Sequence, residues 1–385
     1  MSTRDVRTED TWYEIADETT APSPQVLVFP ERIIRNIRSA IKWAGGAHRL
    51  RPHVKTHKSR DVVRLHLDEG ISKFKCSTLS EAAMLVEAGA PDVLVAYQLV
   101  GPNQAMLCDL IRRFPDTRFA CLVDNAGTLK ALEHEGRKAG VEITVYIDLD
   151  VGMHRTGIIP GDDALELYRT IARSSVLTAG GLHAYDGHIR DPDPAQRRER
   201  AAEARLSAAR LRDRLLSEGV PVPELVVGGT PTFPCHAEAL EDGMSASPGT
   251  YPYFDWGYAT SFPDLPFVGA AVILSRVISV PAPGRFTVDV GSKAIAADPV
   301  QPRGIILNLP EAEAGPQSEE HWVFTVAEEN TPGVGDVMYI WPRHICPTIE
   351  HYNRVAVVSE DGKISDHWEV TARGRDLARD VIAPM

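Results

Sequence analysis

The chain has 385 residues, of which 43% are hydrophobic, and its formal net charge is −12. This length is enough for two domains, or for one barrel with an appendage. The acidic balance argues against partners such as nucleic acid or an anionic membrane surface. The best candidate for a membrane span, residues 267–280, is interrupted by Arg276, so no transmembrane segment is predicted.

The start of the chain and the cysteines both indicate a cytoplasmic protein. Residues 1–15 are polar and acidic and contain no apolar signal core. The five cysteines are an odd and scattered set, which argues against a disulfide framework and for a reducing compartment. They are Cys76, Cys108, Cys121, Cys235 and Cys346.

Short apolar segments alternate with helical ones through the first two thirds of the chain. The first helix is predicted over residues 31–46, where isoleucines recur at helical spacing before Gly45. Eight strands are predicted between such helices. They cover residues 50–55, 73–76, 92–98, 118–124, 143–150, 179–186, 224–229 and 244–249. This alternation is typical of βαβ units, and eight strands favour a closed (β/α)8 barrel of the TIM type.

From about residue 266 the pattern changes to strand-like runs separated by Gly, Pro and Asp turns. Such runs predict an antiparallel β domain. The predicted organisation therefore has three parts. Residues 1–25 form an N-terminal segment that packs on the β domain, residues 26–265 form the barrel, and residues 266–385 form the C-terminal β domain, which holds a metal site.

Polar and glycine-rich residues follow the predicted barrel strands, at the end where barrels of this kind place their chemistry. Lys55 ends the first strand and Gln98 the third, while Arg155 follows the fifth. The sixth ends in "HAYDGH", which contains His183, Tyr185 and His188. We therefore expect one rim of the barrel to carry the functional site.

Two glycine-bearing loops follow the last two predicted strands. The first contains Gly228, Gly229 and Thr230, and the second contains Gly249 and Thr250. Loops at these places often bind a phosphate through backbone N–H groups. A phosphate site together with Lys55 suggests pyridoxal phosphate, whose aldehyde reacts with a lysine amine. Taken alone, the segment around Lys55 fits a solvated, charged strand end better than a catalytic lysine.

Several motifs then carry a resemblance to a known family. They are "RPHVKTHKS", "DVGMHRTG", "GLHAYDGH", "VVGGTPT", "SPGTYPYFD", "VDVGSKA" and "RHICPTI". The chain resembles the fold type III pyridoxal phosphate enzymes, in the branch of the alanine racemase clan that contains D-threonine aldolase and eukaryotic-type D-serine dehydratase. The motifs run in the family's order through nearly the whole chain.

The resemblance implies roles for individual residues. Lys55 would hold the cofactor covalently, with Lys58 as supporting charge. Arg155 would lie near the cofactor's phenolic oxygen, and Tyr185 beside its pyridine ring. In alanine racemases an arginine at the position of Ser247 faces the ring nitrogen of the cofactor. Because this chain lacks that arginine, a second electrophile that helps to activate the substrate would be more useful. The full set implied to contact the cofactor is Lys55, Gln98, Arg155, Tyr185, Gly228, Gly229, Thr230, Gly249, Thr250 and Tyr251.

The same resemblance implies a metal site formed by His344 and Cys346. These residues are predicted to lie on a strand, where side chains two positions apart face the same way. Imidazole and thiolate suit zinc best among common ions, and manganese is the alternative in a family that also uses oxygen ligands. Without the resemblance, a buried cysteine beside an ordinary histidine would be the better interpretation.

The resemblance implies a metal-assisted lyase that acts on a D-3-hydroxy amino acid. Aldol cleavage of D-threonine is slightly favoured, because His188 offers a base separate from Lys55, with His183 as a second candidate base. Dehydration of D-serine or D-3-hydroxyaspartate is the alternative, and Cys346 leans toward it. An amino-acid racemase and a non-catalytic pyridoxal phosphate carrier are less favoured. The family also implies a homodimer.

Overall fold

The computed structural model describes residues 9–374, and the chain divides into two compact units. The barrel unit consists of Ile37–Gly249 with the described residues from Ala372 onward. The β unit consists of the described residues up to Asn36 together with Thr250–Thr371. Helix α1 (Pro30–Ala44) contains the first boundary between them.

The barrel unit is built on a seven-stranded sheet whose strands follow one another in chain order, and every neighbouring pair is parallel. The strands are β2 (Lys73–Cys76), β3 (Asp92–Gln98), β4 (Arg118–Val123), β5 (Ile143–Asp148), β6 (Leu177–Ala184), β7 (Glu224–Val227) and β8 (Met244–Ala246). Strand β5 is buried along its whole length, as expected for a strand covered on both faces.

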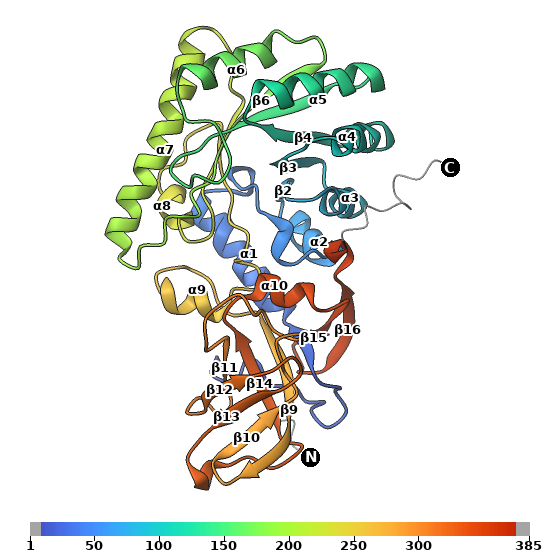
Figure 1. The fold of residues 1–385 in the computed structure, drawn as a ribbon, viewed down its shortest axis with the longest axis vertical. Helices are drawn as coiled ribbons and strands as arrows, with labels where there is room; N and C mark the ends of the chain where they lie inside the picture. Colours follow the sequence, from blue (N-terminus) through green and yellow to red (C-terminus); the bar gives the residue numbers. More distant parts are fainter. Residues whose placement is uncertain (1–8, 375–385) are drawn as a thin grey trace. The chain divides into compact units, whose positions relative to one another are not determined.

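Helices connect these strands and cover the sheet. They are α2 (Arg60–Asp68), α3 (Leu79–Glu87), α4 (Pro102–Arg113), α5 (Ala126–Ala139), α6 (Asp162–Ala172), α7 (Pro194–Ser217) and α8 (Phe233–Ala237). Figure 1 shows α3, α4 and α5 side by side along β2, β3 and β4. Side-chain caps fix where several of them begin: Thr78 accepts a hydrogen bond from the N–H of Glu81, and Asn125 accepts one from the N–H of Thr128.

The ring of strands is closed by residues 50–53, which were predicted to belong to a first strand. Leu50 forms a parallel bridge with Ala246 of β8, and His53 forms one with Lys75 of β2. After His53 the chain turns into a short 3-10 helix, η2 (Val54–Thr56), instead of continuing as a strand. A second short 3-10 helix, η1 (Ala47–Arg49), precedes the segment. The predicted α/β barrel is confirmed, with this segment in place of a regular first strand.

The β unit contains a nine-stranded sheet that is antiparallel apart from the pair β1–β15. Its strands are β1 (Gln25–Val28), β9 (Ala271–Ala282), β10 (Arg285–Val288), β11 (Gly304–Ile306), β12 (Glu313–Gln317), β13 (Trp322–Thr325), β14 (Val337–Pro342), β15 (Arg354–Val358) and β16 (Ile364–Glu369). The short helices of this unit are α9 (Trp256–Ser261), α10 (Ile345–Glu350) and η3 (Glu328–Asn330), and η4 (Thr371–Arg373) contains the last boundary between the units. The predicted antiparallel β domain is therefore confirmed as a fold.

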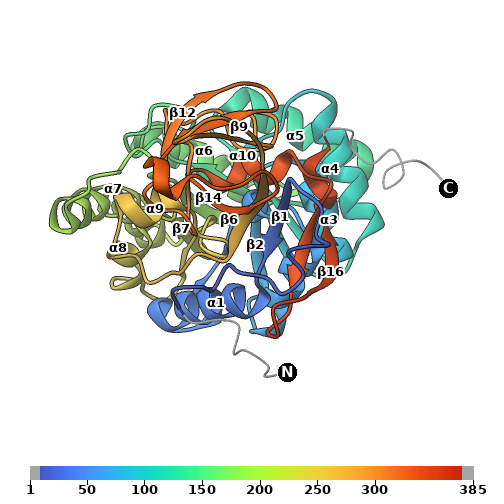
Figure 2. The same cartoon turned by 90° about the horizontal axis from the view of Figure 1, so that it is seen from below.

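An N-terminal strand takes part in this sheet, because β1 pairs with β9 on one side and with β15 on the other. Figure 2 labels β1, β9 and β16 of this sheet. Tyr13 and Ile15 are buried in the same apolar core as Leu27 and Val272. The N–H of Ile15 also donates to the hydroxyl of Tyr339 at 3.1 Å. Residues 1–8 and 375–385, which the predicted first and third parts include, lie outside the described residues. No described helix is long and apolar enough to span a bilayer.

Candidate active site

A cavity of about 500 Å³ lies within the barrel unit, at the carboxyl ends of its strands. This is the rim where the sequence predicts the functional residues. The side chains that matter for its chemistry are Lys55, Lys75, Gln98, Arg155, His183 and Tyr185. Predicted site residues from segments that are far apart in the sequence thus line one cavity.

Lys55 enters this cavity from η2. His53 fixes the turn, because its Nδ1 accepts a hydrogen bond from the N–H of Lys55 at 3.2 Å. The other ring nitrogen of His53 bonds to the hydroxyl of Ser77 on the chain that follows β2. The Lys55 amine lies 6.0 Å from the centre of the Tyr185 ring. No described carboxylate forms an ion pair with Lys55, so its amine faces the cavity without a fixed anionic partner.

Lys58 has very different surroundings although it lies one turn further along. Its amine is buried and forms an ion pair with Glu81, at 2.5 Å between Nζ and Oε1. The second oxygen of Glu81 accepts the N–H of Ser77 at 2.6 Å. Glu81 therefore holds Lys58 as part of the support beneath the Lys55 turn.

Tyr185 follows β6 and presents its ring to cationic groups. The Arg155 guanidinium lies 5.1 Å from the ring centre and the Lys75 amine 5.6 Å from it. A Cβ on Gly229 would come within 3.0 Å of the same ring. A larger residue at Gly229 would therefore have to displace the Tyr185 ring by a few tenths of an ångström.

A line of polar side chains continues from Lys75 across the barrel interior, and sequence analysis did not find it. The Lys75 amine lies 3.3 Å from Nε2 of His183, whose Nδ1 lies 2.7 Å from Oδ1 of Asp148. The second Asp148 oxygen accepts the Gln98 amide at 2.6 Å and the Thr156 hydroxyl at 2.9 Å. Gln98 and His183 were predicted separately, whereas Lys75 and Asp148 were missed because each lies inside a short strand.

Burial dominates the ionisation of this line. Desolvation, with a contribution from Lys55, lowers the pKa of Lys75 to about 7. Burial and the nearby Lys75 also lower the pKa of His183, although Asp148 opposes the shift. The pKa of Asp148 is lowered because hydrogen bonds led by His183 outweigh its burial.

The two predicted phosphate loops meet in the barrel unit. The Thr230 hydroxyl accepts the N–H of Gly249 at 3.0 Å, and the N–H of Gly228 donates to the carbonyl of Ala184. A Cβ on Gly249 would come within 3.1 Å of the His53 Cβ. The second loop therefore packs directly on the residue that caps the Lys55 turn.

Thr250 and Tyr251 belong to the β unit. The Thr250 hydroxyl lies 3.7 Å from the Cys346 sulfur. Tyr251 is buried against Phe267, with 5.3 Å between ring centres. Ser247, in the barrel unit, donates its hydroxyl hydrogen to the carbonyl oxygen of Arg51 at 2.8 Å.

His188 is not among the residues that line the cavity, whereas His183 is. Nδ1 of His188 is buried without a hydrogen-bond partner among the described residues, and burial lowers the pKa of His188. Its Nε2 lies 2.9 Å from the point that a Cβ on Gly152 would occupy. The role of His188 as a base stays a prediction.

The prediction that His344 and Cys346 lie on a strand is wrong. Strand β14 ends at Pro342, His344 is the N-cap residue of α10, and Cys346 lies in its first turn. The helix begins here because the Asp255 carboxylate accepts the free N–H of Ile345 at 3.0 Å.

The two residues are nevertheless neighbours at the start of this helix. Burial alone would lower the pKa of His344, but hydrogen bonds to Cys346 and Asp298 outweigh it and raise the pKa to about 9. Nδ1 of His344 lies 2.6 Å from the Asp298 carboxylate, which sequence analysis missed. Within residues 9–374 no group of three or more potential ligands is arranged as a metal site. An imidazole oriented by a carboxylate, next to a thiol, is a donor set that fits a divalent ion.

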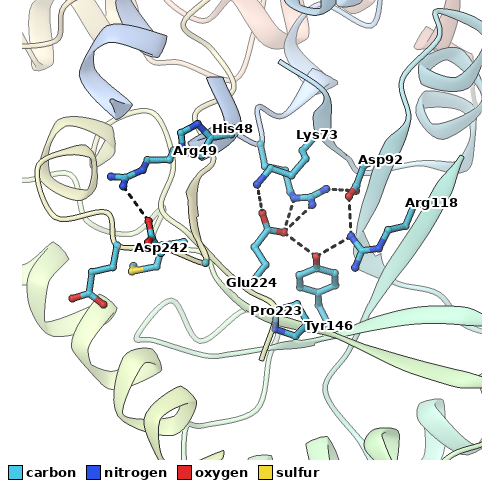
Figure 3. A pocket seen from close by; sticks show the side chains of 13 residues that line it. His48, Arg49, Lys73, Asp92, Arg118, Tyr146, Pro223, Glu224 and Asp242 are labelled. Atoms are coloured by element: carbon cyan, nitrogen blue, oxygen red, sulfur yellow. Dashed lines mark hydrogen bonds and ion pairs between the residues drawn. The ribbon is translucent and has the colours of Figure 1, made fainter. Parts of the chain in front are cut away.

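A second cavity, of about 490 Å³, lies at the amino ends of the same strands (Figure 3). Its charged groups are paired with one another. Glu224 accepts hydrogen bonds from Arg51, Lys73 and the Tyr146 hydroxyl. Asp92 binds Arg51 and Arg118. Because these groups satisfy one another, this end of the barrel is a structural network rather than a reaction site.

The cavity at the carboxyl ends fits pyridoxal phosphate, the cofactor that the sequence resemblance implies. It has the size of a small-molecule site and contains the ring of Tyr185 for contact with a planar ligand. Lys55 supplies a free amine, and Arg155 a permanent cation. The N–H groups of Gly229 and Gly249 donate to the hydroxyls of Thr232 and Thr230, so the two glycine-bearing loops are ordered by threonines.

Comparison with known proteins supports this fit. The sequence model of the family described as "Alanine racemase, N-terminal domain" matches residues 29–255, and that of a serine dehydratase domain matches residues 270–358. The chain is 31% identical to D-threonine aldolase of an Arthrobacter species over 88% of this chain and 89% of that one. It is 27% identical to 3-hydroxy-D-aspartate aldolase of Paracoccus denitrificans, over 93% and 94% of the two chains.

Solved structures show the same relationship. The crystal structure of D-threonine aldolase from Filomicrobium marinum is similar with a TM-score of 0.86 and 28% identity, over 93% of this chain and 97% of that one. D-threo-3-hydroxyaspartate dehydratase from Delftia sp. HT23 gives a TM-score of 0.79 and 26% identity, over 91% and 98%. Proteins named as aldolases and proteins named as dehydratases are thus both similar to this chain along nearly its whole length.

Proposed function

Since this chain belongs to the family of the alanine racemase N-terminal domain, we propose that it is a pyridoxal phosphate-dependent lyase of D-3-hydroxy amino acids, and that it cleaves D-threonine to glycine and acetaldehyde. The observation that carries the proposal is the free amine of Lys55, which faces Tyr185 and Arg155 in one cavity. Relatives named as lyases support the reaction class.

Each residue of the cavity has a task in this proposal. Lys55 holds the cofactor through its amine, Arg155 stabilises negative charge on an oxygen of the ring, and Tyr185 packs against the ring. The loops that contain Thr230 and Gly249, which one hydrogen bond joins, would hold the phosphate. When bound, pyridoxal phosphate supplies an electron sink for the bond that breaks.

Two histidines are candidates for the base that removes the proton from the substrate's β-hydroxyl oxygen. His183 lines the cavity, and Asp148 fixes the orientation of its ring. His188, the base favoured by the motif, has one unpartnered buried nitrogen among the described contacts. Replacing each histidine by asparagine and comparing kcat for D-threonine would decide between them, since loss of the base costs about 100-fold or more.

The metal belongs to the same proposal. His344 and Cys346 would bind zinc or manganese, and Asp298 would orient the imidazole. A divalent ion supplies Lewis acidity, which favours loss of the hydroxyl proton. We also propose a homodimer, which sedimentation of the purified protein would test.

Dehydration is the second candidate function, and Cys346 favours it because the resemblance links cysteine at this position to the dehydratase branch. The similar Delftia protein is named as a D-threo-3-hydroxyaspartate dehydratase. Dehydration gives a keto acid and ammonia, whereas aldol cleavage gives glycine and an aldehyde. The products therefore separate the two reactions.

The deciding experiment incubates the loaded enzyme with D-threonine, D-serine and 3-hydroxy-D-aspartate and identifies every product. We expect glycine and acetaldehyde from D-threonine, none from L-threonine, and no turnover by Lys55→Ala. Formation of 2-oxobutyrate or pyruvate instead would establish the dehydratase. Racemisation of alanine without breakdown of any hydroxy amino acid would refute both.

A further inference from the structure

Lys75 is a buried amine on the wall of the cavity that the proposed reaction does not use. It belongs to β2, its residue is 2% exposed, and its side chain lines the same space as Lys55. Among residues 9–374, its hydrogen-bond partner is Nε2 of His183 at 3.3 Å. An ammonium has three N–H donors, so a charged Lys75 would leave two of them unmet by these residues.

The other end of this contact is firmly fixed. Oδ1 of Asp148 lies 2.7 Å from Nδ1 of His183, so the Nδ1 hydrogen points to the carboxylate and Nε2 is left to accept from Lys75. Gln98 and Thr156 both donate to the second Asp148 oxygen. Asp148 is thereby held in place; it orients the imidazole, and its charge also acts on Lys75 through space.

The charged groups that act on Lys75 come from several elements. They are Lys55, Arg51, Asp148, Asp186, His53 and His183. Burial is the largest effect and lowers the pKa of Lys75 to about 7. The amine is therefore mostly neutral at pH 8 in the empty cavity, and a negative charge placed beside it would restore the ammonium.

We propose that Lys75, oriented by His183 and Asp148, binds an anionic oxygen of the ligand in this cavity and takes up one proton from solvent when that oxygen arrives. The lone pair of Nζ accepts the proton, and the two N–H groups that are not directed at His183 meet the anion. Apart from the phosphate, which the glycine-bearing loops would hold, two groups carry such an oxygen: the phenolic oxygen of the cofactor's ring and the carboxylate of the substrate. This inference rests on the proposed cofactor and substrate class, and it gives Lys75 a role as a binding and positioning residue.

Proton uptake on binding can be measured without turnover, by calorimetry in buffers of different ionisation enthalpy. The first probe is pyridoxamine 5′-phosphate added to the cofactor-free protein, because it has the ring oxygen but no aldehyde for Lys55. The second is 3-hydroxybutyrate added to the loaded enzyme, because it has the carboxylate and hydroxyl of D-threonine but no amine. Uptake with the first probe identifies the cofactor's oxygen, and uptake with the second identifies the substrate's carboxylate.

The expected result is a difference between wild type and Lys75→Met. At pH 8 the wild type should take up nearly one proton more than the variant, and at pH 6 the difference should vanish because Lys75 is already charged. The variant should also bind the responsible probe about 10-fold to 100-fold more weakly at pH 8, as for loss of a charged hydrogen bond. Lys138→Met, which removes an exposed lysine from α5, should behave as the wild type.

Lys75→Arg protects the experiment from a variant that does not fold. Arginine keeps its charge at every accessible pH, so this variant should bind the probe but take up no extra proton. Equal proton uptake by wild type and Lys75→Arg with both probes would overturn the proposal. If these proton differences appear while D-threonine is not cleaved, the lyase reaction fails and the role of Lys75 stands.

Discussion

The three lysines near the start of the barrel differ in what surrounds their amines. Lys58 is held by Glu81, and Lys75 touches His183, whereas Lys55 has no anionic partner among the described residues. A lysine must be uncharged and accessible to attack an aldehyde. Lys55 therefore meets the structural requirement that Lys58 fails.

Reduction of the loaded enzyme with borohydride, followed by peptide mapping, should place the pyridoxyl label on Lys55. In the Lys55→Ala variant, the peptide that contains position 55 and Lys58 should carry no label, because Lys58 does not bind the cofactor. A label found on Lys58 in the wild type would mean that Glu81 releases it and that the assignment of Lys55 is wrong.

Gly249 is a residue at which one methyl group should disturb the cofactor. A Cβ there would press on His53, which caps the Lys55 turn, at 3.1 Å from its Cβ. We expect Gly249→Ala to lower cofactor affinity by about 10-fold, since a misplacement of this size is costly at a preorganised site. Fluorescence titration of the cofactor-free protein would measure it.

Gly161→Ala is the matched control, because a Cβ at Gly161 would have only one neighbour, a carbonyl oxygen at 3.8 Å. It should bind the cofactor as the wild type does. Unchanged affinity in a folded Gly249→Ala variant would show that the loop after β8 has been assigned wrongly.

At this scale the sequence was informative where a motif marks the residue. Lys55, Arg155 and Tyr185 were predicted from their motifs, and they line one cavity. Lys75 was not predicted, because Lys73 and Lys75 of the short strand "KFKC" face the same side, and the sequence does not show that Lys75 reaches the cavity at the carboxyl ends. Asp148 was missed for a similar reason: its importance comes from His183 on the next strand, which only the fold brings near.

Helix α10 stands where a strand was predicted, although the same two residues remain candidate metal ligands. The strand predicted through His344 would have placed both side chains on one face, whereas the helix places His344 at its N-cap and Cys346 in its first turn. The apolar residues of β14 continue to Pro342, and they do not show that a helix follows the strand. The acceptor that ends the strand is Asp255, which lies far away in the sequence.

Asp298→Asn should weaken the proposed metal site without removing a ligand. The carboxylate orients the His344 ring and makes its imidazole a stronger base, and loss of such a partner usually costs about 10-fold to 100-fold in metal affinity. Zinc titration with a competing chelator would measure the affinity. Cofactor binding should not change.

Cys346→Ala provides the stronger comparison, because it removes one of the two proposed ligands. We expect chelation of the wild type and Cys346→Ala each to stop turnover while the cofactor's absorbance remains. Added zinc should restore only the chelated wild type. Normal turnover in both cases would return His344 and Cys346 to a structural role.

At the scale of the barrel, Arg51 and Glu224 form the centre of the network at the amino ends of the strands. The Arg51 side chain is fully buried, and burial, Arg51 and Lys73 act together on Glu224, with the cations outweighing burial and lowering its pKa. Removing one partner from such a network leaves the others buried without compensation. The predicted barrel could be read from the sequence, but this network could not, because its members come from six separate segments.

Glu224→Gln should lower the free energy of unfolding by about 3–5 kcal/mol at pH 7, as measured by urea unfolding. Glu241→Gln is the matched control, since its pair with Arg212 is exposed and should change stability by less than about 1 kcal/mol. Equal urea midpoints for wild type and Glu224→Gln would contradict a stabilising network.

The same comparison has a defined pH dependence. Because the folded pKa of Glu224 is depressed, its contribution is complete above the usual glutamate value of about 4.3 and is lost as the pH falls below it toward the folded value. The stability difference between wild type and Glu224→Gln should therefore be constant from pH 7 to about pH 5 and shrink in more acidic solution. Urea unfolding across this range would measure it.

The closure of the barrel by residues 50–53 has a consequence for how the protein loses its structure. Two single bridges join this segment to β8 and β2, and Lys55 lies two residues beyond the second bridge. If the cofactor is linked to Lys55 and gripped by the loops after β7 and β8, it fastens the first and last segments of the ring to each other. In the cofactor-free protein, amide hydrogens at this closure should then exchange with solvent faster than those elsewhere in the sheet. The bound cofactor would therefore stabilise the closed barrel in addition to taking part in the reaction.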